Sequence, residues 1–506
     1  MADMIRRQFL CSLAAASLNP LRGAPRFSKD PFTLGICSGD PLPDGMVLWT
    51  RLAIEPLAGG GMGQDSHEVE WVVAEDEGLR KIVKRGKSVA TPQFAHSVHA
   101  DVRGLKPARW YWYQFRCGGV ESPVGRTRTA PAAGSHDDLR FAFASCQHFE
   151  TGYYTAYEHM AKEDLHLIVH LGDYIYEGGV GKDRPRSHIS AEIKSLNDYR
   201  NRYALYRSDE HLRKAHQNFP WIVTWDDHEV DNNYANDKEE NGAPRAEFME
   251  RRSNAYQAYY ENMPLRKTSL PRGSSLDLYR TLDFGQLARF HVLDTRQYRS
   301  DQPCGDGRKP QCPAALSPDQ TMLGEAQEKW LMNSMKSARQ TWNVLANQVM
   351  FATMDVKQEE GARAEYSMDQ WSGYEVPRQR LCRFFDEAKP NNPVVITGDI
   401  HSSWASDIKA DFNQPESRNV GVEFVGTSIT SAGDGVENPA TEAALKKKNP
   451  HLHYFLAKRG YVSCTVTPKE WRSEYRVVPF VTKPGARIET RAKFRVGVGA
   501  NKIERA

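Results

Sequence analysis

The fold of this 506-residue chain is decided by residues 165–176, which read Leu165-His166-Leu167-Ile168-Val169-His170-Leu171-Gly172-Asp173-Tyr174-Ile175-Tyr176. The first seven residues are mostly apolar and stop at a glycine, which is typical of a strand buried on both faces. Asp173 and Tyr176 follow in the loop beyond the strand. In open α/β sheets, ligands bind outside the carboxyl ends of the strands. The stretch therefore predicts an α/β domain with a ligand site at this strand end.

Three further segments repeat this pattern of an apolar strand that ends in polar side chains. Residues 139–144 end in Ser145-Cys146, residues 221–225 end in Asp226-Asp227-His228-Glu229, and residues 394–397 end in Gly398-Asp399-Ile400-His401. Stretches of helical period lie between the strands, around 154–165 and 325–335. If the four strands are neighbours in one sheet, the four polar clusters converge in space.

The residue types at these strand ends predict a metal cluster. Asp173 has two carboxylate oxygens and can bridge two cations, and Tyr176 lies three residues further along the same loop. The thiolate of Cys146 and the phenolate of Tyr176 suit Fe(III), whereas carboxylates suit Ca²⁺, Mg²⁺ or Mn²⁺. Asp399 and His401 alternate and share one face of an extended chain. The glycines before Asp173 and Asp399 are expected to let the backbone turn sharply.

The regions flanking these strands predict two further parts of the chain. Residues 31–130 contain short alternating strands between turn signals, which predicts a small all-β sandwich domain. Residues 128–135 read as a linker, and residues 138–506 are expected to form the metal-bearing domain. At the N-terminus, Arg6-Arg7 precede an apolar segment and then small residues, which is the order of a signal peptide over about residues 1–28. The pair indicates the twin-arginine export machinery, or else a chance arginine pair before a short helix.

Composition and cysteine usage narrow the setting of the protein. The formal net charge is +3, and the run 446–448 of three lysines reads as a solvated face, so no specific nucleic-acid binding is evident. No stretch approaches the roughly 20 apolar residues of a membrane span, so no transmembrane anchor is expected. Cys304 and Cys312 lie close together in a polar loop, which predicts a local disulfide in an exported protein. The sequence assigns no partners to Cys37, Cys117, Cys382 and Cys464.

At the strand-end residues the sequence resembles a known family. Gly172-Asp173-x-x-Tyr176, Asp227-His228-Glu229 and Gly398-Asp399-x-His401 resemble the calcineurin-like and purple acid phosphatase signature. Cys146, Asp227 and Asp399 replace the usual Asp, Asn and His, and this variant is similar to the PhoD family of alkaline phosphatases and phosphodiesterases. Residues 35–51, 225–233 and 293–296 also resemble that family. The resemblance covers about residues 31–470.

The resemblance implies an α+β four-layer metallophosphoesterase sandwich behind the small N-terminal β-sandwich. It implies Fe(III) held by Cys146, Asp173, Tyr176 and His401. It also implies one or two Ca(II) ions nearby, held by three carboxylates and by a side chain from Asn347-Gln348. The carboxylates are those of Asp173, Asp227 and Asp399. Family members use the twin-arginine route, which agrees with the arginine pair and predicts a periplasmic or extracellular protein.

The expected reaction is hydrolysis of a phosphate ester by hydroxide that the metal ions activate, in line with the leaving oxygen. His228 is expected to stabilise the pentavalent phosphorus or to protonate the leaving oxygen, or else to orient Asp227. Arg296 is expected either to contact the phosphate or to form a structural ion pair. Two alternatives stay open: a diester-specific, phospholipase D-like hydrolase, and a metal-stabilised binding protein without turnover.

Overall fold

A computed structural model describes residues 26–357 and 363–506. The predicted twin-arginine pair lies outside these residues, as does most of the predicted signal peptide. Within the described ranges, no helix is long and apolar enough to cross a membrane.

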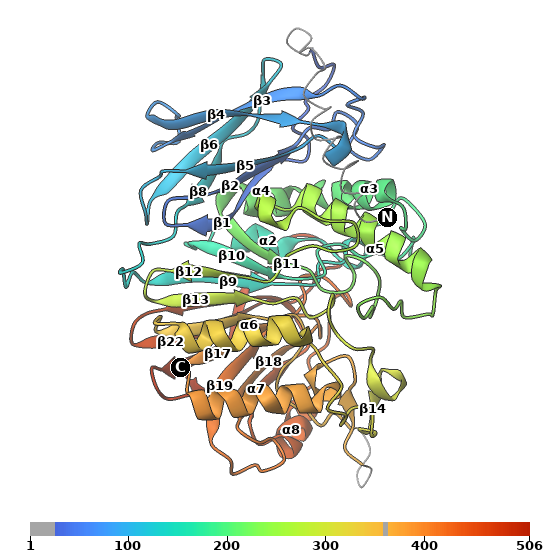
Figure 1. The fold of residues 1–506 in the computed structure, drawn as a ribbon, viewed down its shortest axis with the longest axis vertical. Coiled ribbons are helices and arrows are strands. Elements are labelled where there is room, and N and C mark those ends of the chain that lie inside the picture. The colour runs from blue at the N-terminus through green and yellow to red at the C-terminus, as the bar shows by residue number, and fades with distance from the viewer. Residues whose placement is uncertain (1–25, 358–362) are drawn as a thin grey trace.

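Two large sheets form the centre of the molecule (Figure 1). The ten-stranded sheet has the order β24 (Glu504–Arg505), β23 (Glu489–Gly497), β22 (Glu470–Val478), β21 (Arg459–Val466), β9 (Leu139–Ala144), β10 (Leu167–Leu171), β11 (Pro220–Thr224), β1 (Ile36–Leu42), β2 (Gly45–Arg51) and β5 (Ser97–Arg103). The seven-stranded sheet has the order β12 (Arg280–Phe284), β13 (Ala288–Val292), β15 (Trp342–Ala346), β17 (Pro393–Thr397), β19 (Asn419–Val425), β18 (Ser403–Lys409) and β20 (Leu452–Leu456).

The two sheets pack face to face because their strands are apolar on the facing sides. One continuous core contains Phe141 and Val169 from the first sheet and Phe290, Val344 and Ile396 from the second. Strands β9, β10 and β11 run parallel to one another, and so do β13, β15, β17 and β19. Parallel strands of this kind are buried on both faces, which explains their nearly continuous apolar sequences.

Helices cover the outer face of each sheet, so the domain has four layers (Figure 1). On the side of the ten-stranded sheet lie α2 (Thr155–Met160), α3 (Leu196–Arg207), α4 (Glu210–Asn218) and α5 (Arg245–Asn262). On the side of the seven-stranded sheet lie α6 (Gly324–Ser337) and α7 (Glu375–Ala388). A further helix, α8 (Pro439–Lys448), ends in the lysine run and contacts β20. The α/β fold with four layers is confirmed.

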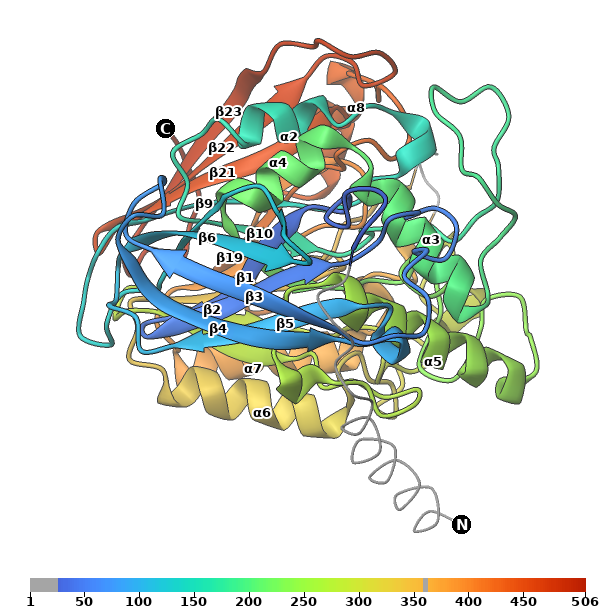
Figure 2. The same cartoon turned by 90° about the horizontal axis from the view of Figure 1, so that it is seen from above.

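The N-terminal strands form a sandwich, but they share a sheet with the rest of the chain (Figure 2). One layer contains β4 (Ile82–Ala90), β3 (His67–Ala74), β6 (Trp110–Cys117), β7 (Val120–Glu121) and β8 (Gly125–Arg128). The other layer is β1, β2 and β5, and the parallel pairing of β1 with β11 joins it to the ten-stranded sheet. The β-sandwich is therefore continuous with the layered domain through backbone hydrogen bonds.

The described cysteines form one disulfide, and the others are free thiols. Cys304 and Cys312 form a disulfide, with their Cα atoms 5.8 Å apart, which confirms the predicted pairing. The loop that carries it includes β14 (Arg308–Lys309), which pairs with β16 (Tyr366–Ser367). The four cysteines without assigned partners are free and buried, as is Cys146.

Candidate metal centre

The four strand ends meet at one place, between the two sheets. Strands β9, β10 and β11 are adjacent in the ten-stranded sheet. The convergence of the four clusters was expected if all four strands are neighbours in one sheet, and that condition is met by these three only, because β17 lies in the seven-stranded sheet. The carboxyl end of β17 nevertheless lies next to the carboxyl ends of β9, β10 and β11, because the two sheets stack with these ends on the same side. The backbone N–H of Cys146 donates to the carbonyl oxygen of Gly172 at 3.1 Å, which ties two of the loops together.

The backbone takes the same unusual conformation at four of the predicted ligands. The φ angles of Cys146, Asp173, Asp399 and His401 are 59°, 57°, 60° and 55°. Residues other than glycine rarely adopt this left-handed region, and each such residue costs of the order of 1–3 kcal/mol. Strained residues persist only where the surrounding packing holds them in place, and they cluster at functional sites.

The two glycines before the aspartates act in different ways. Gly172 has a φ of +110°, and a Cβ atom there would lie 2.5 Å from the Cβ of Asp226. Gly398 itself has no left-handed backbone, but the chain does turn sharply directly after it, where the N–H of Ile400 donates to the carbonyl oxygen of Gly398 at 2.8 Å. A Cβ atom on Gly398 would lie 2.5 Å from the Oγ of Ser145. Gly398 therefore lets an end of one sheet approach an end of the other.

Cys146, Asp173 and His401 form the first cluster. Each offers a ligand atom, and these atoms lie within 4.8 Å of one another. The hydroxyl of Tyr176 joins them: it donates to Asp173 Oδ2 at 2.8 Å and lies 3.3 Å from Nε2 of His401. Ser431 donates to the same hydroxyl at 2.6 Å. Thiol, carboxyl, phenol and imidazole thus face one point.

Asp226, Asp227 and Asp399 form the second cluster, with ligand atoms also within 4.8 Å. Asp173 and Asp227 fall together in a third group with His228, so Asp173 lies between the first two clusters. Oδ1 of Asp173 and Oδ1 of Asp227 are buried and have no hydrogen-bond partner among the described residues. Buried carboxylate oxygens are normally satisfied, so these two match the donors that a cation requires.

The pKa shifts of these carboxylates also favour a bound cation. Burial, with the neighbouring carboxylates, holds the pKa of Asp173 well above its usual value, although His228 opposes this. Burial also raises the pKa of Asp399, to about 6. Burial would raise the pKa of Asp227 as well, but Arg296 and His228 hold it below its usual value. Crowded buried carboxylates carry excess negative charge, which a bound cation relieves.

His228 is positioned by a carboxylate that the sequence did not single out. Its Nδ1 lies 2.7 Å from Oε2 of Glu177. Burial would lower the pKa of His228, but Glu177, Asp227 and Asp173 raise it well above its usual value. The ring lies against Tyr176, with centroids 4.0 Å apart. Glu177 therefore orients the imidazole at the edge of the cluster and favours its protonated form.

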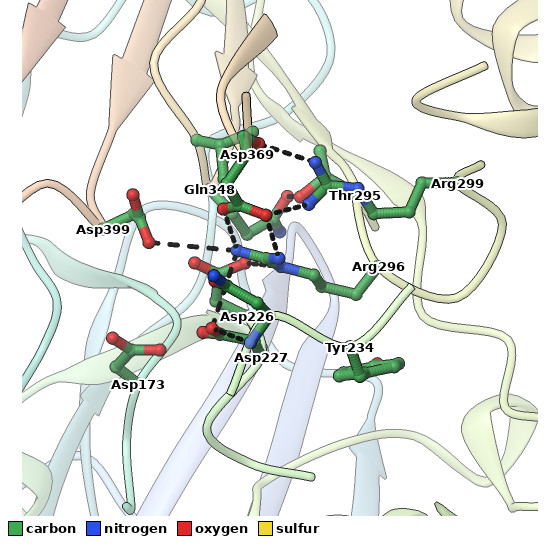
Figure 3. A network of polar contacts seen from close by, with 12 residues as sticks. Asp173, Asp226, Asp227, Tyr234, Thr295, Arg296, Arg299, Gln348, Asp369 and Asp399 are labelled. Atoms are coloured by element: carbon green, nitrogen blue, oxygen red, sulfur yellow. Dashed lines mark hydrogen bonds and ion pairs between the residues drawn. The ribbon is translucent and has the colours of Figure 1, made fainter. Parts of the chain in front are cut away.

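Arg296 lies behind the aspartates, and Figure 3 shows how its guanidinium is surrounded. Its Nε donates to Asp226 at 2.6 Å, and its two Nη atoms each donate to Asp369 at 2.8 Å. Nη2 also lies 3.9 Å from Asp227 and 3.9 Å from Asp399. The side chain is completely buried. The sequence left two roles open for Arg296, a phosphate contact and a structural ion pair. These contacts favour the ion pair.

Asn347 is held in a hydrogen-bond network. Its Oδ1 accepts from the indole N–H of Trp371 at 3.2 Å, and its amide donates to the carbonyl of Val349 and to the hydroxyl of Thr397. The adjacent Gln348 is equally engaged, because its amide donates to Thr224 and Leu293. The structure thus gives both amides structural partners, and a ligand role for Asn347 stays a prediction.

Two residues around the centre were given no role from the sequence. Glu229 accepts from the backbone N–H groups of Asp173, Tyr174 and Asp226, so it fixes the strand ends of β10 and β11. Gln370 donates to Asp399. Glu229 could have been found from its place beside His228. Gln370 could not, because nothing local marks it as a neighbour of residue 399.

A cavity of about 870 Å³ opens beside Asp399 and His401. Met350, Trp404 and Leu445 line its apolar wall. It is large enough to hold the organic part of a substrate next to the clustered ligands.

Comparisons with known proteins show the family and the fold. The family described as PhoD-like phosphatase matches residues 141–475, and that family's N-terminal domain matches residues 15–131. Alkaline phosphatase D of Bacillus subtilis (strain 168) is 54% identical over 480 residues, which cover 94% of this chain and 82% of that protein. A solved structure of PhoD is 53% identical and superposes with a TM-score of 0.93, covering 96% of this chain and 93% of the other.

A more distant solved structure shares the fold alone. Purple acid phosphatase PPD1 from yellow lupin (Lupinus luteus) seeds is 12% identical, with a TM-score of 0.54, and the match covers 92% of this chain and 73% of that one. With most of its length matched by the family and its N-terminal domain, and with a relative that is more than half identical, the chain belongs to the PhoD-like phosphatase family.

Proposed function

We propose that this chain is an exported, metal-dependent alkaline phosphatase or phosphodiesterase, whose metal ions are held by the two clusters between the sheets. Membership of the family supports hydrolysis of phosphate esters. The observation that carries the assignment to these residues is the pair of orphaned buried oxygens, Oδ1 of Asp173 and Oδ1 of Asp227. They lie where two groups of anionic and imidazole donors adjoin.

The chemistry of the donors supports one iron and calcium. Thiol and phenol groups in the first cluster, those of Cys146 and Tyr176, suit Fe(III) with Asp173 and His401. The carboxylates of Asp227 and Asp399, with Asp173 between the clusters, suit one or two Ca(II) ions. When bound, such ions would supply charge neutralisation of the phosphate and activation of water for attack on phosphorus.

The residues of the chain then supply positioning and proton transfer. Glu177 holds the imidazolium of His228 beside the cluster, where it can donate a proton to the leaving oxygen. Arg296 holds the carboxylates of the second cluster close to one another. The apolar wall of the cavity excludes water from one side of the site.

The size of the cavity is compatible with one of the alternatives left open by the sequence. About 870 Å³ is far more than a phosphate group occupies, and it leaves room for the second substituent of a diester. A phosphodiesterase preference is therefore a second candidate within the same reaction class. The arginine pair before an apolar segment supports export of the folded, metal-loaded protein by the twin-arginine route.

The test uses protein expressed with its own N-terminus, with iron and calcium supplied. Hydrolysis of p-nitrophenyl phosphate and of bis-p-nitrophenyl phosphate is compared at alkaline pH, with and without a calcium chelator. We expect turnover that the chelator removes, and the ratio of the two rates ranks monoester against diester. Full metal content without turnover of either ester would support the metal-stabilised binding protein instead.

A further inference from the structure

Arg459 is a second buried arginine at the centre, and it lies on the cavity side. It is the first residue of β21, only 3% of it is exposed, and it lines the cavity together with Asp399 and His401. Arg296, by contrast, is enclosed by carboxylates behind the clusters. The two guanidinium groups therefore face different partners.

The hydrogen bonds of Arg459 all go to neutral oxygen atoms. Its Nε donates to the carbonyl of Gly433 at 2.7 Å. Its Nη1 donates to the carbonyl of His401, to Ser428 Oγ at 3.0 Å and to Thr427 Oγ1 at 3.2 Å. These bonds fix the plane of the guanidinium, but none of them neutralises its charge.

No carboxylate of the described residues lies within ion-pair distance of Arg459. Asp434 is close in sequence to its partners, but that carboxylate accepts from the backbone of Val481 and from Thr482. Cys146 and Tyr176 can carry negative charge nearby, but in the proposed function a metal ion takes them. A buried guanidinium without a counter-ion is costly, so an anion is expected to complete this site.

One donor of the guanidinium is available for such an anion. Among residues 26–357 and 363–506, Nη2 of Arg459 has no hydrogen-bond partner. Gly435 approaches this atom closely, and a Cβ atom on that residue would crowd it at 2.8 Å from Nη2. The N–H groups of Nη2 thus remain unused in a residue that lines the cavity.

We propose that Arg459 binds the phosphoryl oxygens of the substrate through Nη2, and that the substrate phosphate is its missing counter-ion. The proposal rests on the proposed function and takes over the phosphate contact that the sequence offered to Arg296. Guanidinium matches the geometry of phosphate oxygens, and an ion-assisted hydrogen bond strengthens as charge builds on them in phosphoryl transfer. Arg459 thereby acts as a catalytic residue as well as a binding residue.

The test measures the binding of inorganic phosphate to the metal-loaded protein by calorimetry, so that it does not depend on turnover. Arg459→Gln keeps a donor at about the position of Nε, where the carbonyl of Gly433 accepts, but loses the charge. We expect its dissociation constant for phosphate to rise about 10- to 100-fold, the range for one charge-assisted hydrogen bond. Arg459→Lys is expected to lose less, because it keeps the charge without the planar donors. The control Arg472→Gln removes an exposed arginine outside the cavity and is expected to bind phosphate as the wild type does.

Two further readouts separate this role from a structural one. Metal content of Arg459→Gln is expected to equal that of the wild type, and guanidinium ions in the assay are expected to raise the residual activity of Arg459→Ala. Unchanged phosphate binding in Arg459→Gln would overturn the proposal. Loss of metal from that variant would also overturn it, because Arg459 would then act by positioning His401. Wild-type protein that binds phosphate but hydrolyses no ester would refute the proposed function and leave the binding role of Arg459 standing.

Discussion

Replacement of Arg296 by methionine provides a sharp test of how the centre is built. The guanidinium is completely buried and holds Asp226 at 2.6 Å and Asp369 at 2.8 Å. Removal of one partner from a buried ion pair typically costs about 3–5 kcal/mol. Asp369 keeps Arg299 at 3.1 Å and Gln302 at 2.7 Å, so the uncompensated charge is mainly that of Asp226, whose Oδ2 is already orphaned.

We therefore expect Arg296→Met to lose about 3–5 kcal/mol of unfolding free energy, the cost of one pair and not of two. This is a large part of the roughly 5–15 kcal/mol that stabilises a typical protein. Urea unfolding in one metal-containing buffer measures it. The double variant Arg296→Met with Asp226→Asn removes the lone charge and is expected to recover about 2 kcal/mol relative to additivity.

The matched control is Arg472→Met, which removes an exposed arginine paired with Glu470 and is expected to change stability by less than about 0.5 kcal/mol. If Arg296→Met unfolds like the wild type but binds phosphate more weakly, the ion-pair reasoning is wrong and Arg296 is a phosphate contact.

Three other predictions concern the ligands, the proton donor and pH. Asp173→Asn is expected to lose both metal and activity, measured by elemental analysis and ester turnover, whereas the same change at the exposed Asp164 leaves both intact; wild-type turnover in Asp173→Asn would exclude a bridging role. His228→Ala is expected to keep its metal and to lower kcat about 10²- to 10⁴-fold, and loss of metal would instead make it a ligand. Burial lowers the pKa of His291 to about 4, so the unfolded chain takes up a proton near pH 6.5 before the folded chain does. The stability present above pH 6.5 is thus lost as pH falls towards 4, by about 3 kcal/mol for this group, and His291→Gln is expected to flatten that part of the urea-unfolding profile.

The sequence by itself determined the chemistry and the local structure. Four apolar strands ending in Cys146, Asp173, Asp227 and Asp399 indicated an α/β domain and a metal cluster, because strand length and the polar residues after it are local properties. The disulfide between Cys304 and Cys312 was also local, since the two cysteines are only eight positions apart.

Only the tertiary structure decided which sheet each strand joins and which distant side chains complete the centre. Strand β17 is as apolar as β9, β10 and β11, yet it joins the other sheet. The apolar pattern of a strand does not say which strand it will pair with. Asp369 and Arg459 lie 73 and 58 residues from the groups they contact, Arg296 and His401. Such contacts follow from the stacking of two sheets, so no local pattern predicts them. The different roles of Arg296, which pairs with carboxylates, and of Arg459, which we propose to bind phosphate, follow from burial and from the nearby counter-ions. Both exist only in the folded chain.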